Sequence, residues 1–219
     1  MEKQRVLIIG ANGKIGRLVC QKMAKSAYFE PVAAIRDEDQ APYFKELSVM
    51  HRLIDLEGAV DNLITHMEDI QAIVFTAGSG GTTGFNKTLS VDLDGAVKCM
   101  EAAESAGVRR FVMVSAVHAD NRGAWEATGI KPYYIAKHYA DRALKASPLD
   151  YTILRPARLL DGPGTGQVAI DSQSGAPLEI FREDVAEVIL HVLPERRFIG
   201  KTMDLIQGDR SIEDELAGL

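Results

Sequence analysis

The stretch Arg5-Val-Leu-Ile-Ile-Gly10-Ala-Asn-Gly13-Lys-Ile-Gly16 decides the fold of this chain. A short apolar, β-branched run ends at Gly10, and a helical pattern begins within a few residues of it. A strand that passes through a glycine turn directly into a helix is typical of the first βαβ unit of a parallel sheet. Free N–H groups and the helix dipole make the start of such a helix favourable for an anion, such as a dinucleotide pyrophosphate. The stretch therefore predicts both an α/β fold and a phosphate site.

The three glycines of this turn have the spacing G-x-x-G-x-x-G rather than the more specific G-x-G-x-x-G. The first glycine permits the tight turn, the second lets the backbone approach a phosphate, and the third allows close packing of helix on strand. A strand–helix turn without a ligand is the alternative. Because the turn follows the first strand of an alternating series, we favour dinucleotide binding. The expected cofactor contacts in the turn are Gly10, Asn12, Gly13, Lys14, Ile15 and Gly16.

Short strands and longer helices continue to alternate along most of the chain. The strands are near-continuous apolar runs, as expected where helices cover both faces of a sheet. The fold class that follows is α/β, with a doubly wound parallel sheet. We predict strands at residues 5–9, 32–35, 51–54, 72–76, 110–114 and 151–154. We predict helices between them at residues 13–25, 40–47, 59–66, 88–106 and 132–146.

The C-terminal part of the chain is less regular. A loop rich in Gly, Ser and Pro is expected at 161–177, with one short strand at 167–170. A helix at 182–193, a strand at 203–206 and a helix at 212–216 complete the chain. With 219 residues and no linker, two complete domains would be a tight fit. We therefore expect a single domain over residues 1–219, in which residues 155–219 form a small C-terminal substrate cap.

Composition excludes several classes of function. The chain carries 25 basic and 31 acidic side chains, a net charge of −6, without a block of like charge, so a nucleic-acid partner is not expected. Its longest apolar stretches are shorter than a bilayer-spanning helix, and a strand begins too early for a signal peptide, so we expect a cytoplasmic protein without membrane contact. The two cysteines, Cys20 and Cys99, lack ligand spacing and are expected to be buried apolar residues.

The residue about twenty positions past the last glycine selects between NAD and NADP. An acidic residue there would bind the ribose 2′-hydroxyl of NAD, whereas this chain has Arg36, whose guanidinium suits the 2′-phosphate of NADP. Asp37 follows and could serve NAD instead, and Arg36 could simply be solvated. We predict NADP(H) as the cofactor, with Arg36 as a phosphate ligand.

Two other strand ends offer cofactor contacts. Asp55 and Leu56 end the third expected strand, where the carboxylate could accept from the adenine amino group and the Leu56 backbone could contact the ring. A turn or N-cap aspartate is the alternative for Asp55. The small residues Ala77 and Gly78 end the fourth strand and would let a flat cofactor ring lie against the backbone.

A serine, a tyrosine and a lysine follow in an order that suggests catalysis. Ser115 ends the fifth strand, and Tyr133 and Lys137 lie four residues apart on one face of the next helix. We expect the ammonium to lower the pKa of the phenol, to make it an acid–base group, and also to bind ribose hydroxyls. A packing role for the tyrosine, or an ion pair of Lys137 with Asp141, is the alternative.

Two residues near Ser115 are left open. His118 lies three residues beyond it and could act as an acid–base group or be solvated. Trp125, the only tryptophan, could line the substrate cleft or pin its own loop.

These motifs together resemble the short-chain dehydrogenase/reductase superfamily, and in particular its atypical members with an NmrA-like or NAD(P)H-binding domain. The resemblance implies a Rossmann fold, NADP(H) at the strand ends, and a Ser–Tyr–Lys triad at Ser115, Tyr133 and Lys137. It also implies a backbone contact to the nicotinamide carboxamide near Pro156. Ala157 stands where family members usually have Gly, which still permits that contact. The matching stretches are residues 10–16, 92–96, 108–115, 133–137, 150–156 and 184–186.

The function expected from the sequence is an NADP(H)-dependent oxidoreductase that acts on a small carbonyl, alcohol or related acceptor. A redox-sensing regulatory protein that binds NADP(H) without turnover is one alternative. Epimerase or dehydratase chemistry is another. The expected partner is a small-molecule substrate, and the expected state is a monomer or small homo-oligomer.

Overall fold

The structure is a computed structural model that describes residues 3–80, 83–171 and 178–219. Its central sheet consists of β1 (Gln4–Ile9), β2 (Phe29–Ile35), β3 (Met50–Leu53), β4 (Ala72–Phe75), β5 (Arg110–Val114), β6 (Asp150–Pro156), β8 (Gln167–Ile170), β10 (Lys201–Gln207) and β11 (Arg210–Ser211). The strand order is β11-β8-β10-β6-β5-β4-β1-β2-β3, and the strands from β10 to β3 pair in parallel. The predicted α/β class and parallel sheet are confirmed.

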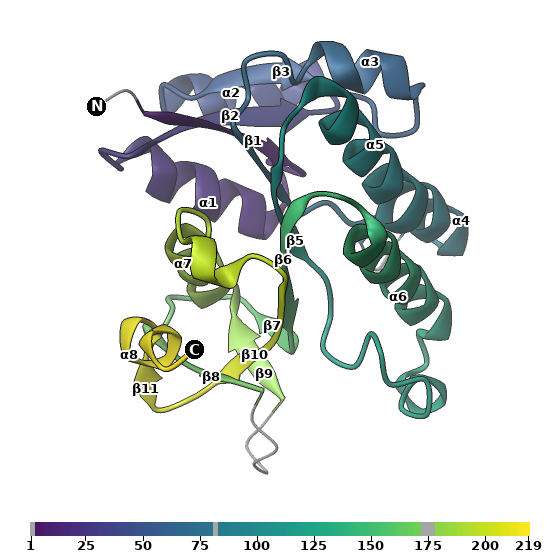
Figure 1. Ribbon diagram of the computed structural model, residues 1–219, viewed down its shortest axis with the longest axis vertical. Coiled ribbons are helices and arrows are strands. Elements are labelled where there is room, and N and C mark those ends of the chain that lie inside the picture. Colours follow the sequence, from purple (N-terminus) through teal and green to yellow (C-terminus); the bar gives the residue numbers. More distant parts are fainter. Residues whose placement is uncertain (1–2, 81–82, 172–177) are drawn as a thin grey trace.

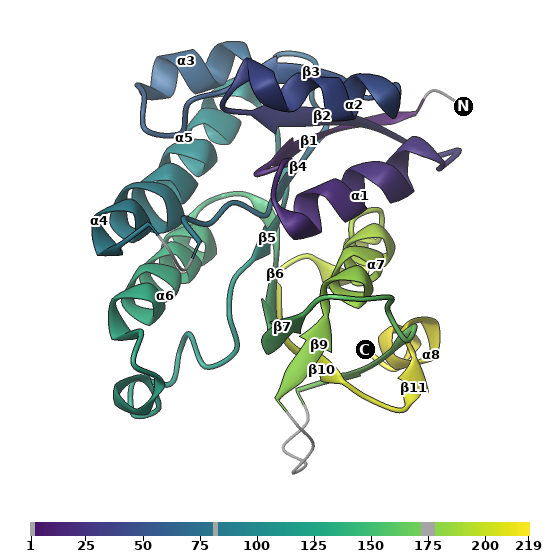
Figure 2. The ribbon, with the colours of Figure 1, turned by 180° about the vertical axis from the view of Figure 1, so that it is seen from behind.

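Helices cover both faces of this sheet (Figures 1 and 2). The helices are α1 (Lys14–Ala24), α2 (Ala41–Glu46), α3 (Val60–Thr65), α4 (Phe85–Lys87), α5 (Ala96–Ala106), α6 (Lys131–Ala146), α7 (Arg182–Val192) and α8 (Ile212–Ala217). Short 3₁₀ turns lie at Glu38–Gln40, Trp125–Thr128 and Arg196–Phe198. In both views α1 and α7 lie on one face, and α3, α5 and α6 lie on the other.

The first strand shows how the sequence builds the two layers of core. Val6 and Ile8 face the core shared with α1 and α7, whereas Leu7 and Ile9 face the core shared with α3 and α5. All four side chains are fully buried. Alternate residues of a strand point to opposite faces, so a strand covered on both sides must be apolar throughout.

Strand order reverses beside β1, which places the glycine turn at the switch point of the sheet. The chain moves from β1 to its neighbour β2 and on to β3, and then returns to β4 on the opposite side of β1. Ligands of doubly wound sheets bind at the carboxyl ends of the strands where such a reversal occurs. The topology therefore puts the residues after β1 and β4 next to each other.

The predicted helix over residues 88–106 is wrong in its detail. A π-helix occupies Thr88–Gly95, and the regular helix α5 begins only at Ala96. The wider turn accommodates a buried polar residue, Asp92, on the same face as Ala96 and Met100. Segments of π-helix are rare and occur frequently at functional sites.

Residues of the expected cap also extend the central sheet. β10 pairs in parallel with β6, and β8, at the predicted 167–170, pairs antiparallel with β10. Two strands not predicted from the sequence, β7 (Arg158–Leu160) and β9 (Glu179–Phe181), form a separate parallel pair. Positions 172–177 of the expected loop lie outside the described residues. The assignment of a substrate cap to residues 155–219 stays a prediction.

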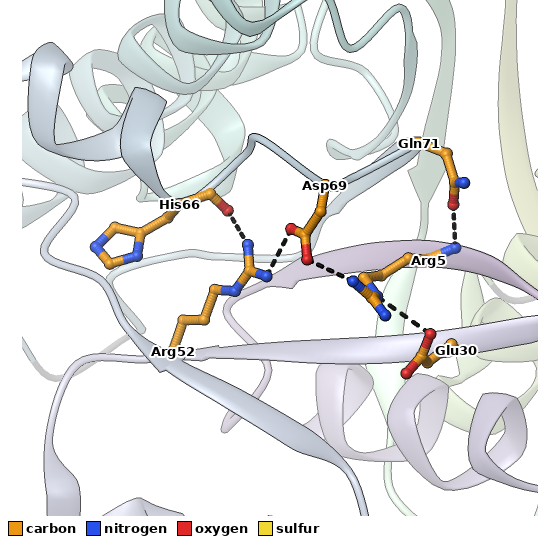
Figure 3. A network of polar contacts seen from close by, with 6 residues as sticks. All are labelled: Arg5, Glu30, Arg52, His66, Asp69 and Gln71. Carbon is orange, nitrogen blue, oxygen red and sulfur yellow. Dashed lines mark hydrogen bonds and ion pairs between the residues drawn. The ribbon is translucent and has the colours of Figure 1, made fainter.

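Ion pairs tie Arg5 of β1 and Arg52 of β3 to Asp69, which precedes β4 (Figure 3). Asp69 lies between Arg5 and Arg52, and its Oδ1 is 2.6 Å from Nη2 of Arg52. The hydrogen bond from Arg52 lowers the pKa of Asp69. Glu30 on β2 pairs with the same arginine, with 3.1 Å between its Oε2 and Nε of Arg5. This network lies at the edge of the sheet opposite to the glycine turn.

Two of the expectations from composition can be compared with the structure. Cys20 and Cys99 are buried, as predicted, and burial raises the pKa of each thiol to about 12. Among the described residues, no helix has the length and apolar character that crossing a membrane requires. The same part of the chain holds no cluster of His, Cys, Asp and Glu arranged for a metal ion.

Candidate active site

A cavity of about 780 Å³ lies at the carboxyl ends of the central strands. Its lining comes from the glycine turn before α1, the residues that follow β4, β5 and β6, the first turns of α6, the segment from α4 into the π-helix, and residues beside β9 and α7. These segments are far apart in the sequence and meet because parallel strands end at the same edge. The cavity therefore lies where the sequence predicts the cofactor and the catalytic residues.

The glycine turn is packed so tightly that side chains would not fit. Gly10 has a φ of +80°, and a Cβ there would lie 2.6 Å from the Cα of Ala77 after β4. A Cβ on Gly16 would lie 2.3 Å from the carbonyl oxygen of Gly10. This packing brings the first residues of α1, Lys14 and Ile15, to the wall of the cavity. An α-helix leaves its first N–H groups without helical partners, so they can bind an anion there.

Some of the predicted cofactor residues line the cavity, some shape the glycine turn, and the others lie elsewhere. Those that line the cavity are Gly13, Lys14, Ile15, Ala77, Gly78, Lys137 and Pro156. Gly10 and Gly16 shape the turn, as described above.

The remaining predicted cofactor residues lie outside the described cavity lining. Asn12 accepts hydrogen bonds from the Arg17 guanidinium, the nearer at 2.6 Å. Arg36 is exposed at the end of β2. Asp55 accepts from the N–H of Glu57 at 2.9 Å, the turn geometry that the sequence left as its alternative. The side chain of Leu56 packs against Gly95 of the π-helix.

Tyr133 and Lys137 face the same part of the cavity from α6. The Nζ of Lys137 lies 5.6 Å from the centre of the Tyr133 ring. Lys137 is only 4% exposed, and its Nζ is 3.0 Å from Oδ1 of Asp92, which is 1% exposed. The other carboxylate oxygen of Asp92 accepts from the N–H of Ser79 at 2.8 Å. A buried carboxylate therefore neutralises the lysine beside the tyrosine.

This ion pair changes the electrostatics expected from the sequence. Burial raises the pKa of Tyr133, the charge of Lys137 opposes that effect, and the charge of Asp92 adds to it. Burial acts to lower the pKa of Lys137, but Tyr133 and Asp92 more than offset it, so that pKa is raised. The expected lowering of the Tyr133 pKa is thus wrong, because desolvation outweighs an ammonium that already has a partner.

Ser115 lines the cavity, and Asp141 is buried on α6, four residues after Lys137. Asp141 on α6 pairs with Arg155 of β6, whose Nε donates to Oδ2 at 2.8 Å. Since Lys137 pairs with Asp92 instead, the alternative ion pair between Lys137 and Asp141 is wrong. Burial raises the pKa of Asp141. Ser115 is 3% exposed and follows β5 directly.

Three buried side-chain oxygens in the described part of the chain lack a hydrogen bond of good geometry, although one of them, on Asp92, is in the ion pair with Lys137. They are Oδ1 of Asp92, Oγ of Ser115 and Oδ1 of Asp141. Buried polar atoms without a hydrogen bond are rare in folded proteins and call for an explanation. Ser115 lines the cavity and has no ion-pair partner, so its hydroxyl is the one of the three that is free to bind a polar atom of a ligand.

The structure locates His118 and Trp125, the two residues that the sequence left open, and the role of His118 stays a prediction. His118 lines the cavity, with a φ of +63°. Trp125 is buried and donates from Nε1 to the carbonyl of His118 at 2.9 Å. The tryptophan therefore pins its loop and holds the backbone at His118.

Sequence reasoning missed Asp92, although a signal was present. Asp92 lies four residues before Ala96 and eight before Met100, so it shares their apolar helix face. A carboxylate on a face that must be buried is unusual unless it is paired. Arg158 and Arg182 also line the cavity and were missed, because they follow the last predicted core strand.

Residues 10–196 match the family described as NAD(P)H-binding. The chain belongs to the NAD(P)H-binding family. The resemblance to atypical short-chain dehydrogenases/reductases is thereby confirmed, together with the Rossmann fold. Members of such families bind a nicotinamide dinucleotide and are oxidoreductase-like or epimerase-like.

Three similar proteins illustrate this NAD(P)H-binding family. The Bacillus subtilis protein named "Uncharacterized sugar epimerase YhfK" is 43% identical over 98% of this chain and 100% of its own length. A Bacillus halodurans structure, assigned by name to the NAD-dependent epimerases/dehydratases, is 37% identical with a TM-score of 0.91 and covers 99% of this chain and 100% of its own. The oxidoreductase ylbE from Lactococcus lactis is 30% identical with a TM-score of 0.89 and covers 99% and 96%.

Proposed function

We propose that the protein is an NADP(H)-dependent oxidoreductase that reduces a carbonyl or related acceptor. The observation that carries this proposal is the convergence of Tyr133, Lys137 and the unpartnered hydroxyl of Ser115 on one cavity beside the glycine turn. The name of the Lactococcus lactis relative, an oxidoreductase, agrees with it.

The cavity residues fit a nicotinamide dinucleotide. The glycine turn offers the N–H groups of α1 to a pyrophosphate without an intervening side chain. Ala77 and Gly78 present small residues on which a flat ring can lie, and the backbone after Pro156 faces them across the cavity. Lys137 is positioned to donate to ribose hydroxyls in addition to its pair with Asp92. When bound, the nicotinamide would supply or accept a hydride.

The side chains of this chain would handle the proton. Tyr133 donates the proton of its hydroxyl to the substrate oxygen as that oxygen gains negative charge, and Ser115 donates a hydrogen bond to the same atom. A raised pKa keeps Tyr133 protonated at neutral pH, which is the state that a general acid requires. The reverse reaction would use the phenolate of the same residue to accept the proton.

Arg36 supports NADP over NAD. Its side chain is exposed after the end of β2, where it is available to bind the 2′-phosphate of NADP. Asp37, the competing acidic residue, uses Oδ1 to accept a hydrogen bond from the N–H of Asp39 at 3.2 Å. We expect tighter binding of NADPH than of NADH in a fluorescence titration, and loss of that preference in Arg36→Gln. Equal affinities in the unsubstituted protein would exclude the assignment.

Replacement of Tyr133 by Phe tests the catalytic assignment. It should reduce turnover of a carbonyl panel by about 10²- to 10⁴-fold, the usual contribution of a general acid, with NADPH affinity retained. Tyr139→Phe is a matched control, because Tyr139 is an exposed residue of the same helix that contacts Arg122. Full activity in Tyr133→Phe would rule out the proposed general acid.

Two other functions use the same residues. Epimerase or dehydratase chemistry agrees with the names of two relatives, and product analysis with a sugar-nucleotide panel would detect it. A regulatory protein would bind NADP(H) tightly and turn over none of the carbonyl, quinone and flavin acceptors. Cytoplasmic location and a monomeric or small homo-oligomeric state stay predictions.

A further inference from the structure

The lining of the cavity includes three large apolar side chains that are partly exposed. They are Phe85, Ile130 and Leu178, which are 54%, 46% and 46% exposed. Large apolar side chains are seldom left in water, and a group of them around one opening marks a binding surface. They come from α4, from the residue before α6 and from the residue before β9, so only the tertiary structure brings them to one opening.

The charged side chains of the described lining are mostly basic, although the chain as a whole is acidic. The protein carries a net charge of −6, yet Arg158 and Arg182 line the cavity together with His118. The one carboxylate in the described lining is Asp92, which is already paired with Lys137. Basic side chains therefore outnumber carboxylates in the described lining, and two carboxylates outside it are shared among them: Asp161 pairs with Lys14 and Arg182, and Glu179 pairs with Arg158.

Arg182 is the better placed of the two arginines to bind an anion. Its side chain is 21% exposed, whereas that of Arg158 is 72% exposed and is paired with Glu179. Toward the described residues, Arg182 donates from Nη1, both to the Leu159 carbonyl at 3.1 Å and to Asp161 at 2.7 Å. A guanidinium has five N–H donors in a planar fork, and within residues 3–80, 83–171 and 178–219 those on Nη2 and Nε make no hydrogen bond and can bind a planar anion.

We propose, building on the reductase function above, that the acceptor is an amphipathic anion. Its flat apolar body lies against Phe85, Ile130 and Leu178, and a carboxylate on that body binds Arg182. A simple uncharged aldehyde would fill the catalytic end of the cavity and leave the three apolar side chains and the guanidinium unused.

A matched pair of aldehydes tests this proposal. 6-Formyl-2-naphthoate and 2-naphthaldehyde have the same aromatic body and differ only in the carboxylate. With NADPH, we expect a KM about tenfold or more lower for the naphthoate, which is the usual contribution of a hydrogen bond to a charged group. Arg182→Gln should abolish this difference through KM with little change in kcat. Arg142→Gln is the control, because Arg142 is on α6 and lies against Tyr139.

A binding measurement separates this inference from the proposed function. Calorimetric titration of the NADP⁺-saturated protein with 2-naphthoate and 2-naphthalenemethanol should show the same preference for the anion and its loss in Arg182→Gln. If neither aldehyde is reduced but this binding preference is found, the reductase function fails and the anion site stands. Equal affinities for the two probes would overturn the proposal. So would an Arg182→Gln variant that loses NADPH affinity but treats both probes as the unsubstituted protein does, because Arg182 would then serve the cofactor.

Discussion

Replacement of Asp92 by Asn should move the titration of Tyr133 to lower pH. Asp92 and Lys137 form a buried ion pair beside the tyrosine, with 3.0 Å between Oδ1 and Nζ. Asparagine has nearly the same volume and retains an oxygen that can accept from the N–H of Ser79. The substitution therefore removes the negative charge and little else, which leaves Lys137 free to stabilise the phenolate.

The distances set the size of the effect. A unit charge at Nζ, 5.6 Å from the centre of the Tyr133 ring, attracts a phenolate by about 3 kcal/mol at an effective dielectric constant of about 20. Oδ1 of Asp92 lies no farther from that centre than the two distances added together, about 8.6 Å. Its repulsion is then at least about 2 kcal/mol. Since 1.36 kcal/mol corresponds to one pH unit, the titration midpoint should fall by about one unit or more.

Tyrosine labelled with ¹³C at Cζ allows the measurement by NMR without a substrate, and Tyr133→Phe assigns the resonance. Tyr134, Lys137 and Asp141 also act on this phenol and are unchanged by the substitution. In a turnover assay, the alkaline limb of the pH profile should move in the same direction. Asp94→Asn is the control, because Asp94 is exposed and pairs with Lys98.

An unchanged or higher midpoint would refute the reasoning. It would mean that Lys137, once it has lost its partner, gives up its proton rather than stabilising the phenolate, as buried lysines can do. Removing one member of a buried pair also destabilises a protein by about 3–5 kcal/mol, so the variant should unfold at lower urea concentration.

Three further predictions concern the fold. Gly16→Ala should abolish folding or cofactor binding, because the added Cβ would lie 2.3 Å from the carbonyl oxygen of Gly10. Gly123→Ala is the control: its Cβ would make only an ordinary contact at 3.4 Å, so its stability in urea denaturation should be unchanged. Asp69→Asn should cost at most about 1 kcal/mol at neutral pH, because its side chain is 43% exposed. The pKa of Asp69 is lowered from 3.8, so the ion pairs stabilise the protein above that pH, and this contribution is lost as the pH falls through the lower pKa of the folded state. Denaturation of both proteins at two pH values tests this prediction. An equal loss of stability at both pH values would contradict the ion-pair explanation. Phe111→Ala should cost about 3–5 kcal/mol, since the ring is fully buried against Phe75, and a loss below 1 kcal/mol would contradict the packing described here.

Local patterns predicted the elements that bring the site together. The β-branched runs and the glycine turn carry information that does not depend on distant contacts, which is why β1, α1 and β5 lie close to their predicted positions. The π-helix at Thr88–Gly95 could not be read from periodicity, because its wider turn accommodates a carboxylate whose partner, Lys137, is 45 positions away in the chain.

The amino-acid sequence alone determined the doubly wound sheet, the family and the order of Ser115, Tyr133 and Lys137, because each of these follows from residues near one another in the chain. Only the tertiary structure decided the charge state around Tyr133 and the character of the substrate end of the cavity. Burial and the Asp92 carboxylate reverse the pKa direction that Tyr133 and Lys137 alone suggest. Desolvation and charge pairing depend on what surrounds a group in space, and neither can be read from its neighbours in the chain.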